Sequence, residues 1–116
     1  MDRVAPITVI GGANIDISAK YSSAVAAAGD SNQGQISTSA GGVARNIAEN
    51  LARLGSAVQL ITGLGDDGFS VSVRSSLNLH LLDLSACYVP PNTPSDSYLS
   101  LYDIKGEPVG ALNQMR

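Results

Sequence analysis

The sequence has no tryptophan, one cysteine and one histidine. The single thiol, Cys87, cannot form an internal disulfide and has no partner at metal-site spacing, so we expect a small residue packed in a strand. His80 has no serine, cysteine or second histidine arranged around it, which favours a surface or helix-end residue over a catalytic one. The sequence therefore predicts no disulfide framework and no metal site.

Charge and long apolar runs are also scarce. Seven lysines and arginines stand against ten acidic residues, a formal net charge of -3, and the basic residues are too scattered to bind a nucleic-acid polymer. No apolar run approaches the roughly 20 residues that cross a bilayer, and the start Met1–Val4 has no hydrophobic signal-peptide core. We expect a cytoplasmic protein that contacts neither nucleic acid nor membrane.

The sequence does contain enough apolar residues for one domain. Leucine, valine, isoleucine and phenylalanine make up about a quarter of the 116 residues, above the roughly 20% level below which chains are disordered. This length corresponds to a single domain. The chain can therefore bury a core.

Three apolar segments are typical of strands, at residues 6–12, 57–62 and 84–89. The near-continuous apolar run of the first predicts a central parallel strand covered on both faces. Because a helical pattern separates the first two segments, we expect a strand–helix–strand unit with parallel strands. The predicted fold class is α/β.

Two helices are expected, over residues 43–54 and 68–80, and Gly55 should end the first. Apolar residues recur at helical spacing in each, which indicates a stripe facing the core. The stripes are Val43, Ile47, Leu51 and Leu54 in the first helix and Phe69, Val73, Leu77 and Leu81 in the second. Arg45 is expected outside, as an exposed ion-pair partner of Glu49 more than as a ligand contact.

The loop Gly63–Gly68 precedes the second helix. It lacks the alternating oxygen ligands of an EF-hand and the third glycine of a dinucleotide fingerprint. We therefore expect a structural turn in which Asp66 or Asp67 is the helix N-cap.

The remaining segments have one polar face. Residues 34–39 alternate weakly, and residues 97–103 and 109–113 are expected to form a hairpin around a turn at Lys105 and Gly106. The proline-rich stretch before them cannot join a central ladder. Within a single unit, 1–116, we expect a small β lid built from residues 17–20, 34–39 and 97–113.

Asn14 and Asp16 are expected in a loop after the first strand, two positions apart, and would share one face of an extended chain. A carboxylate accepts hydrogen bonds from vicinal hydroxyls, and an amide both donates and accepts, so the pair could hold one edge of a sugar. The alternative is that both are ordinary turn residues.

Gly41 and Gly42 precede the first helix. They either only permit a tight turn or expose the helix-start amides to a ligand oxygen, for which phosphate would compete with sugar. Asn46, one turn in, either contacts that ligand or faces solvent. Tyr98 and Tyr102 in the hairpin either stack on a nucleobase or sugar face or pack against a second subunit.

Four segments follow one another along the chain: GGANID, GQISTSAGGVARNIAENLARLG, GLGDDGFS and SYLSLYDIKGEPVGALN. In this order they resemble the amino-terminal part of the ribokinase-like (phosphofructokinase B type) carbohydrate kinases. The resemblance implies a ribokinase-like three-layer fold with a β-sheet lid. It also implies a set of substrate-binding residues: Asn14, Asp16, Gly41, Gly42 and Asn46.

The resemblance further implies ATP-dependent phosphorylation of a sugar or nucleoside, with Mg2+ to neutralise the phosphate charge, and pseudouridine or a related ribose-containing molecule as acceptor. Family members carry a Gly-Ala-Gly-Asp motif whose aspartate is the catalytic base, and this chain contains no such motif. We expect no catalytic residue, bound ATP or phosphate transfer in this chain alone. Open lid edges favour a homodimer, and the alternative function is a non-catalytic sugar-binding or dimerisation module.

Overall fold

The computed structural model describes residues 4–24 and 29–116. Three of the four residues at the start, for which no signal-peptide core was predicted, lie outside the described residues. No described helix is long and apolar enough to cross a membrane. In chain order the elements are β1 (Ile7–Ile10), β2 (Asn14–Tyr21), β3 (Gly34–Gly41), α1 (Val43–Arg53), β4 (Val58–Ile61), α2 (Gly68–Ser76), β5 (Leu82–Asp83), β6 (Ser97–Tyr102) and β7 (Pro108–Gln114).

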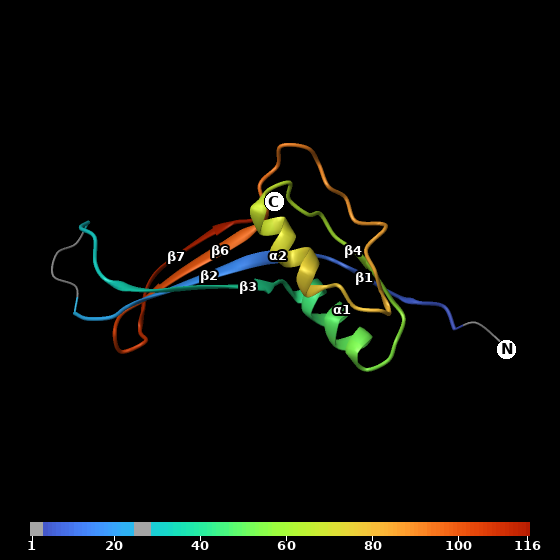
Figure 1. Ribbon diagram of the computed structural model, residues 1–116, viewed down its shortest axis with the longest axis horizontal. Coiled ribbons are helices and arrows are strands. Elements are labelled where there is room, and N and C mark those ends of the chain that lie inside the picture. Colours follow the sequence, from blue (N-terminus) through green and yellow to red (C-terminus); the bar gives the residue numbers. More distant parts are fainter. Residues whose placement is uncertain (1–3, 25–28) are drawn as a thin grey trace.

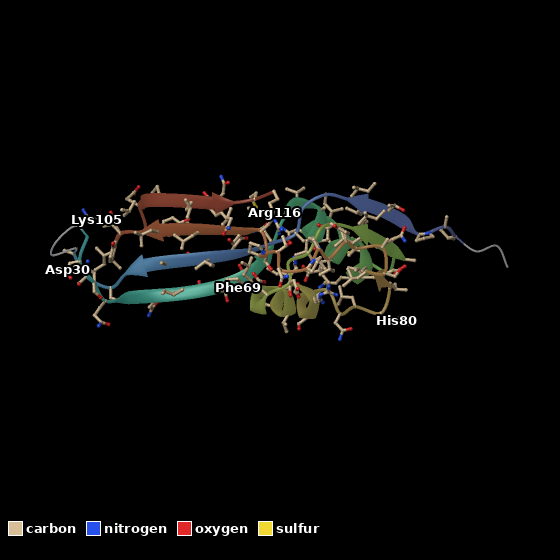
Figure 2. All side chains as sticks on the ribbon, turned by 90° about the horizontal axis from the view of Figure 1, so that it is seen from above. Asp30, Phe69, His80, Lys105 and Arg116 are labelled. Atoms are coloured by element: carbon tan, nitrogen blue, oxygen red, sulfur yellow. The ribbon has the colours of Figure 1, made fainter. Side chains whose placement is uncertain are left out.

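The strands form two separate sheets (Figure 1). A parallel sheet of order β1-β4-β5 packs with the helices, and we call this part the α/β layer. A mixed sheet of order β3-β2-β6-β7 contains the three predicted lid segments, and we call it the lid sheet. The chain measures 66 × 31 × 18 Å, because the lid sheet extends away from the α/β layer (Figure 2). The α/β class predicted from the sequence is confirmed.

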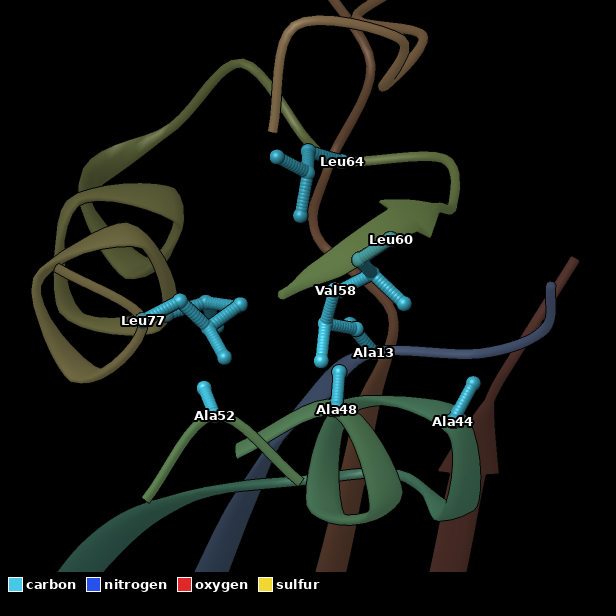
Figure 3. Packing of buried hydrophobic residues seen from close by; sticks show 9 residues of the cluster. Ala13, Ala44, Ala48, Ala52, Val58, Leu60, Leu64 and Leu77 are labelled. Atoms are coloured by element: carbon cyan, nitrogen blue, oxygen red, sulfur yellow. The ribbon is translucent and has the colours of Figure 1, made fainter. Parts of the chain in front are cut away.

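The core of the α/β layer lies between α1 and β4. Three alanines of α1 point at Val58 and Leu60 of β4, and Leu77 closes the core beside α2 (Figure 3). Burying one such large side chain contributes about 1.5–3 kcal/mol. The buried alanines are Ala44, Ala48 and Ala52.

The prediction that the apolar stripe of α1 faces the core is wrong. Val43 is 77% exposed and Leu54 is 83% exposed, whereas Leu51 alone of that stripe packs against the core. The alanines repeat at the same spacing one position further on, and their small side chains let the helix lie close to β4. Two candidate stripes therefore exist in the sequence, and packing selects the smaller one.

Two strand predictions also need correction. β1 is not central: it is an edge strand that pairs only with β4 among the described residues, and Ile10 is 74% exposed. The third strand is Leu82–Asp83 rather than 84–89, and Tyr88 adds only an isolated bridge to Gly63. Cys87 accordingly lies in no strand, although it packs against the core as predicted of a small residue.

The second helix begins as predicted but ends earlier. Asp67 is its N-cap, and its carboxylate accepts a hydrogen bond from the backbone N–H of Ser70 at 3.1 Å. Val73 and Leu77 are buried as expected, while Phe69 lies partly exposed near the lid sheet (Figure 2). The helix ends at Ser76, so His80 lies beyond it on the surface, as expected.

The lid sheet has one polar and one apolar face. The hairpin of β6 and β7 is confirmed, with Gly106 at φ 84° in its turn. Because directly paired residues lie on the same side of a sheet, the register assigns each side chain to a face. The polar lid face carries Asn14, Asp16, Ser18, Ser37, Ser39, Tyr98, Ser100 and Asn113. The apolar lid face carries Ile15, Ile17, Ile36, Leu99, Leu101 and Leu112.

Candidate functional site

Asn14 and Asp16 lie at the start of β2, not in a loop as predicted. The alternation of the strand places both on the polar lid face. Asn14 is buried, and its Nδ2 donates a hydrogen bond to Oδ1 of Asp16 over 2.7 Å. Since a side-chain amide nitrogen only donates, this bond fixes the carboxylate in one orientation.

The same carboxylate lies against the backbone of Gly41, the last residue of β3 and the cross-strand partner of Asn14. A Cβ atom added at Gly41 would overlap Oδ2 of Asp16. Any other residue would displace the carboxylate. The position of Asp16 therefore requires glycine at position 41. This reason differs from both predicted roles of Gly41, the tight turn and the exposure of helix-start amides.

Gly42 forms the turn from β3 into α1. It is the N-cap at φ 103°, and an added Cβ would lie 2.5 Å from the carbonyl oxygen of Gly12. The turn therefore requires glycine here. No side chain caps the start of α1, and a ligand contact at Gly42 stays a prediction.

Asn46 and Arg45 differ in exposure. Asn46 is exposed in the first turns of α1, whereas Arg45 is only 5% exposed and not the surface ion-pair member that was predicted. Its guanidinium donates to Oδ1 of Asn46 at 2.6 Å, to Glu49 at 2.8 Å and to Ser76 of α2 at 3.2 Å. The sequence contained the pairing with Glu49, but the approach of α2, which buries the guanidinium, depends on tertiary packing.

A row of polar side chains crosses the lid sheet at Asp16. Tyr98 on β6 pairs with Asp16, and Asn113 on β7 pairs with Tyr98. Tyr102 pairs with Lys20, four residues further along each strand, so the register separates it from Asp16. Asn113 was not among the predicted site residues, because its place opposite Tyr98 depends on the register of the hairpin.

A separate hollow lies at the carboxyl ends of β1 and β4. It has a volume of about 560 Å³ and is lined by Gly12, Gly63, Tyr88 and neighbouring residues. None of the predicted substrate-binding side chains lines it, although Gly12 touches the turn at Gly42. The candidate site is therefore the region around the fixed carboxylate of Asp16, and not this hollow.

The loop between β4 and α2 has a structural role, as predicted. Asp67 accepts hydrogen bonds from the backbone N–H of Ser95 at 2.8 Å and from its hydroxyl at 2.6 Å. Burial raises the pKa of Asp67, but the bonds from Ser95 and from the start of α2 outweigh it, so that the pKa is lowered. Asp67 thus joins the second helix to the segment that enters the lid sheet.

Comparison with known proteins agrees with this architecture. A protein-family model described as "pfkB family carbohydrate kinase" matches residues 5–109. The chain belongs to the pfkB family. Pseudouridine kinase from Escherichia coli (strain K12) is 40% identical over 109 residues, which cover 94% of this pfkB chain and 34% of that protein. The uncharacterized sugar kinase YeiI from the same strain is 35% identical over 83 residues, 72% of this chain and 23% of that protein.

Solved structures of other proteins contain the same fold as this chain. The carbohydrate kinase from Agrobacterium tumefaciens superposes with a TM-score of 0.86 at 30% identity, over 96% of this chain and 36% of that one. The structure of Arabidopsis thaliana ribokinase complexed with ribose and ATP superposes with a TM-score of 0.83 at 21% identity. This match covers 94% of this chain and 35% of that one. The ribokinase-like fold predicted from the sequence is confirmed. The chain spans about a third or less of the length of the curated relatives it matches.

Among residues 4–24 and 29–116, no group of three or more His, Cys, Asp or Glu side chains could hold a metal ion.

Proposed function

We propose that this chain forms the acceptor-binding part of an ATP-dependent sugar or nucleoside kinase, with pseudouridine as the leading acceptor. The observation that carries the proposal is the Asp16 carboxylate, fixed by Asn14 and laid against Gly41 where the lid sheet joins α1. Membership of the pfkB family and the 40% identity to a pseudouridine kinase support it.

The geometry suits a hydroxyl-bearing ligand. A carboxylate such as that of Asp16 accepts hydrogen bonds from sugar hydroxyls, and charge-assisted bonds are stronger than neutral ones. Because Asn14 and Gly41 hold the carboxylate in advance, the ligand does not need to order it. Phosphoryl transfer also needs a base and neutralisation of the phosphate charge. The chain supplies positioning, and we expect it to transfer no phosphate alone.

The test is calorimetric titration of the chain with pseudouridine, ribose, fructose 6-phosphate and adenosine. We expect Asp16→Asn to weaken binding of the preferred acceptor about 10- to 150-fold, the equivalent of about 1.5–3 kcal/mol for a charged hydrogen bond. Its melting temperature should not change, because Asp16 lies outside the apolar core. Asp30→Asn, in an exposed turn, is the charge-matched control. Equal affinities for both variants would contradict the proposal.

We further propose that the chain forms a homodimer through the lid sheet. Ile36 and Leu112 are largely exposed on the apolar lid face, and β3 and β7 are open edges of that sheet among the described residues. A second copy would cover this surface. Leu112→Lys should give a monomer in sedimentation, while Ala111→Lys, on the opposite face of the same strand, should not. A dimer that binds no sugar would support the non-catalytic dimerisation module instead.

A further inference from the structure

We propose that Arg45 is a positioning residue: it fixes the side-chain amide of Asn46 so that the N–H donors, and not the oxygen, face the acceptor. The inference rests on the proposed sugar-binding function. It adds a role for a buried side chain that does not itself reach the ligand.

The contact between the two side chains sets the polarity of the amide. Nη1 of Arg45 lies 2.6 Å from Oδ1 of Asn46. A guanidinium has five donors and no acceptor, so the atom it binds must be the amide oxygen. The NH2 group of Asn46 then points away from Arg45, on an exposed residue of α1.

Arg45 is itself held from two further sides. Its Nη2 pairs with Glu49 at 2.8 Å, and its Nε donates to the hydroxyl of Ser76, which donates in turn to the carbonyl of Val73 at 2.6 Å. Chiefly because of the hydrogen bond from Arg45, the pKa of Glu49 is lowered. The arginine charge is thus paired within the protein, which argues against an anion site at this helix start.

The two amides of the site consequently have opposite polarity. The amide nitrogen of Asn14 donates to Asp16, whereas the amide oxygen of Asn46 accepts from Arg45. In the proposed function, Asp16 would then supply a hydrogen-bond acceptor and Asn46 a donor. A polyol matches this pair, because one hydroxyl can donate to the carboxylate while another oxygen accepts from the amide.

The first test uses Asn46→Asp, which has the same shape and no donor. Without ligand, the new carboxylate faces Arg45, so the melting temperature should stay the same or rise, whereas Asn46→Ala should lower it. Affinity for pseudouridine should nevertheless fall about tenfold. Equal falls in melting temperature for the two variants would overturn the polarity, and so would wild-type affinity in Asn46→Asp.

The second test is a double-mutant cycle on affinity. Arg45→Met should weaken pseudouridine binding about 2- to 10-fold in the wild-type background and cause no further loss in Asn46→Ala. Additive losses would show that Arg45 has only a structural role and would overturn the inference. If Arg45→Met does not fold, the Asn46→Asp result decides the inference alone.

The two hypotheses can fail separately. If the wild-type chain binds none of the sugars, the proposed function fails, while the ligand-free melting temperatures still test the polarity of Asn46. If the wild-type chain binds pseudouridine and Asp16→Asn weakens this binding as expected, but Asn46→Asp binds normally, only the inference about Arg45 fails.

Discussion

The α/β layer and the lid sheet are built from the same chain but are stabilised differently. In the α/β layer, Leu60 and Ala48 are fully buried and Leu77 nearly so. In the lid sheet, β6 and β7 contain no buried residue, and only the start of β2 and the end of β3 do. The lid sheet therefore depends on its backbone ladders, with no apolar core of its own.

The difference has a functional consequence. A sheet with no core leaves most of both faces open, and in the proposed function one face binds the acceptor while the other meets a second copy of the chain. Ile15 is the exception: it is buried on the apolar lid face directly beside Asn14 and Asp16, where α2 contacts β2. The candidate site thus lies where the lid sheet contacts the α/β layer, which suits a carboxylate that must be held in place.

The strongest test of this comparison deletes one large apolar side chain from each region. Leu60→Ala should lower the free energy of unfolding by about 2–5 kcal/mol, because it leaves a cavity in a close-packed core. Leu112→Ala, at a side chain that is 68% exposed in the single chain, should change the free energy of unfolding of the monomer by less than about 0.5 kcal/mol. Urea unfolding measures both, and similar losses would show that the lid sheet has a core after all.

The next test addresses the turn that joins the two regions. Gly42→Ala should destabilise the chain by about 1–3 kcal/mol, because an L-residue is strained at φ 103° and its Cβ would meet the backbone of Gly12. Gly12→Ala is the matched control, since an added Cβ there meets nothing within 4 Å. Thermal unfolding of the two variants should differ clearly. Equal stability would mean that the turn relaxes without cost.

A smaller effect is expected at the contact between α2 and the segment entering β6. Asp67→Ala removes an N-cap and should cost about 0.5–2 kcal/mol; it also leaves the buried Ser95 without its partner. Asp66→Ala loses only an exposed bond to the backbone of Asn92 and should cost less. Denaturant midpoints compare the two variants, and the reverse ranking would contradict the assigned cap.

The smallest effect is a pH dependence within the α/β layer. Because the pKa of Glu49 is lowered in the folded chain, its contribution to stability is complete above its unfolded value of about 4.3 and is lost as pH falls through the folded value. Glu49→Gln should therefore flatten the acid side of a plot of melting temperature against pH. Glu107→Gln, in the lid turn, is the control and should leave the slope unchanged.

Local chemistry made part of this protein readable from its sequence. The cap at Asp67, the hairpin turn at Gly106 and the shared face of Asn14 and Asp16 depend on residues within a few positions of one another. The family resemblance, carried by short ordered segments, likewise led to the correct fold. These features were predictable because the backbone geometry they need is encoded beside them.

Other features were decided only by the tertiary structure. α1 carries two apolar stripes at the same spacing, and the close approach of β4 selects Ala44, Ala48 and Ala52. Arg45 is buried because α2 brings Ser76 to it, and Asn113 joins the row at Asp16 because the hairpin has one register. Turns, caps and polar pairs follow from residues that are neighbours along the chain. Which faces become buried depends on surfaces distant in sequence, because burial is a property of two elements in contact and not of either alone.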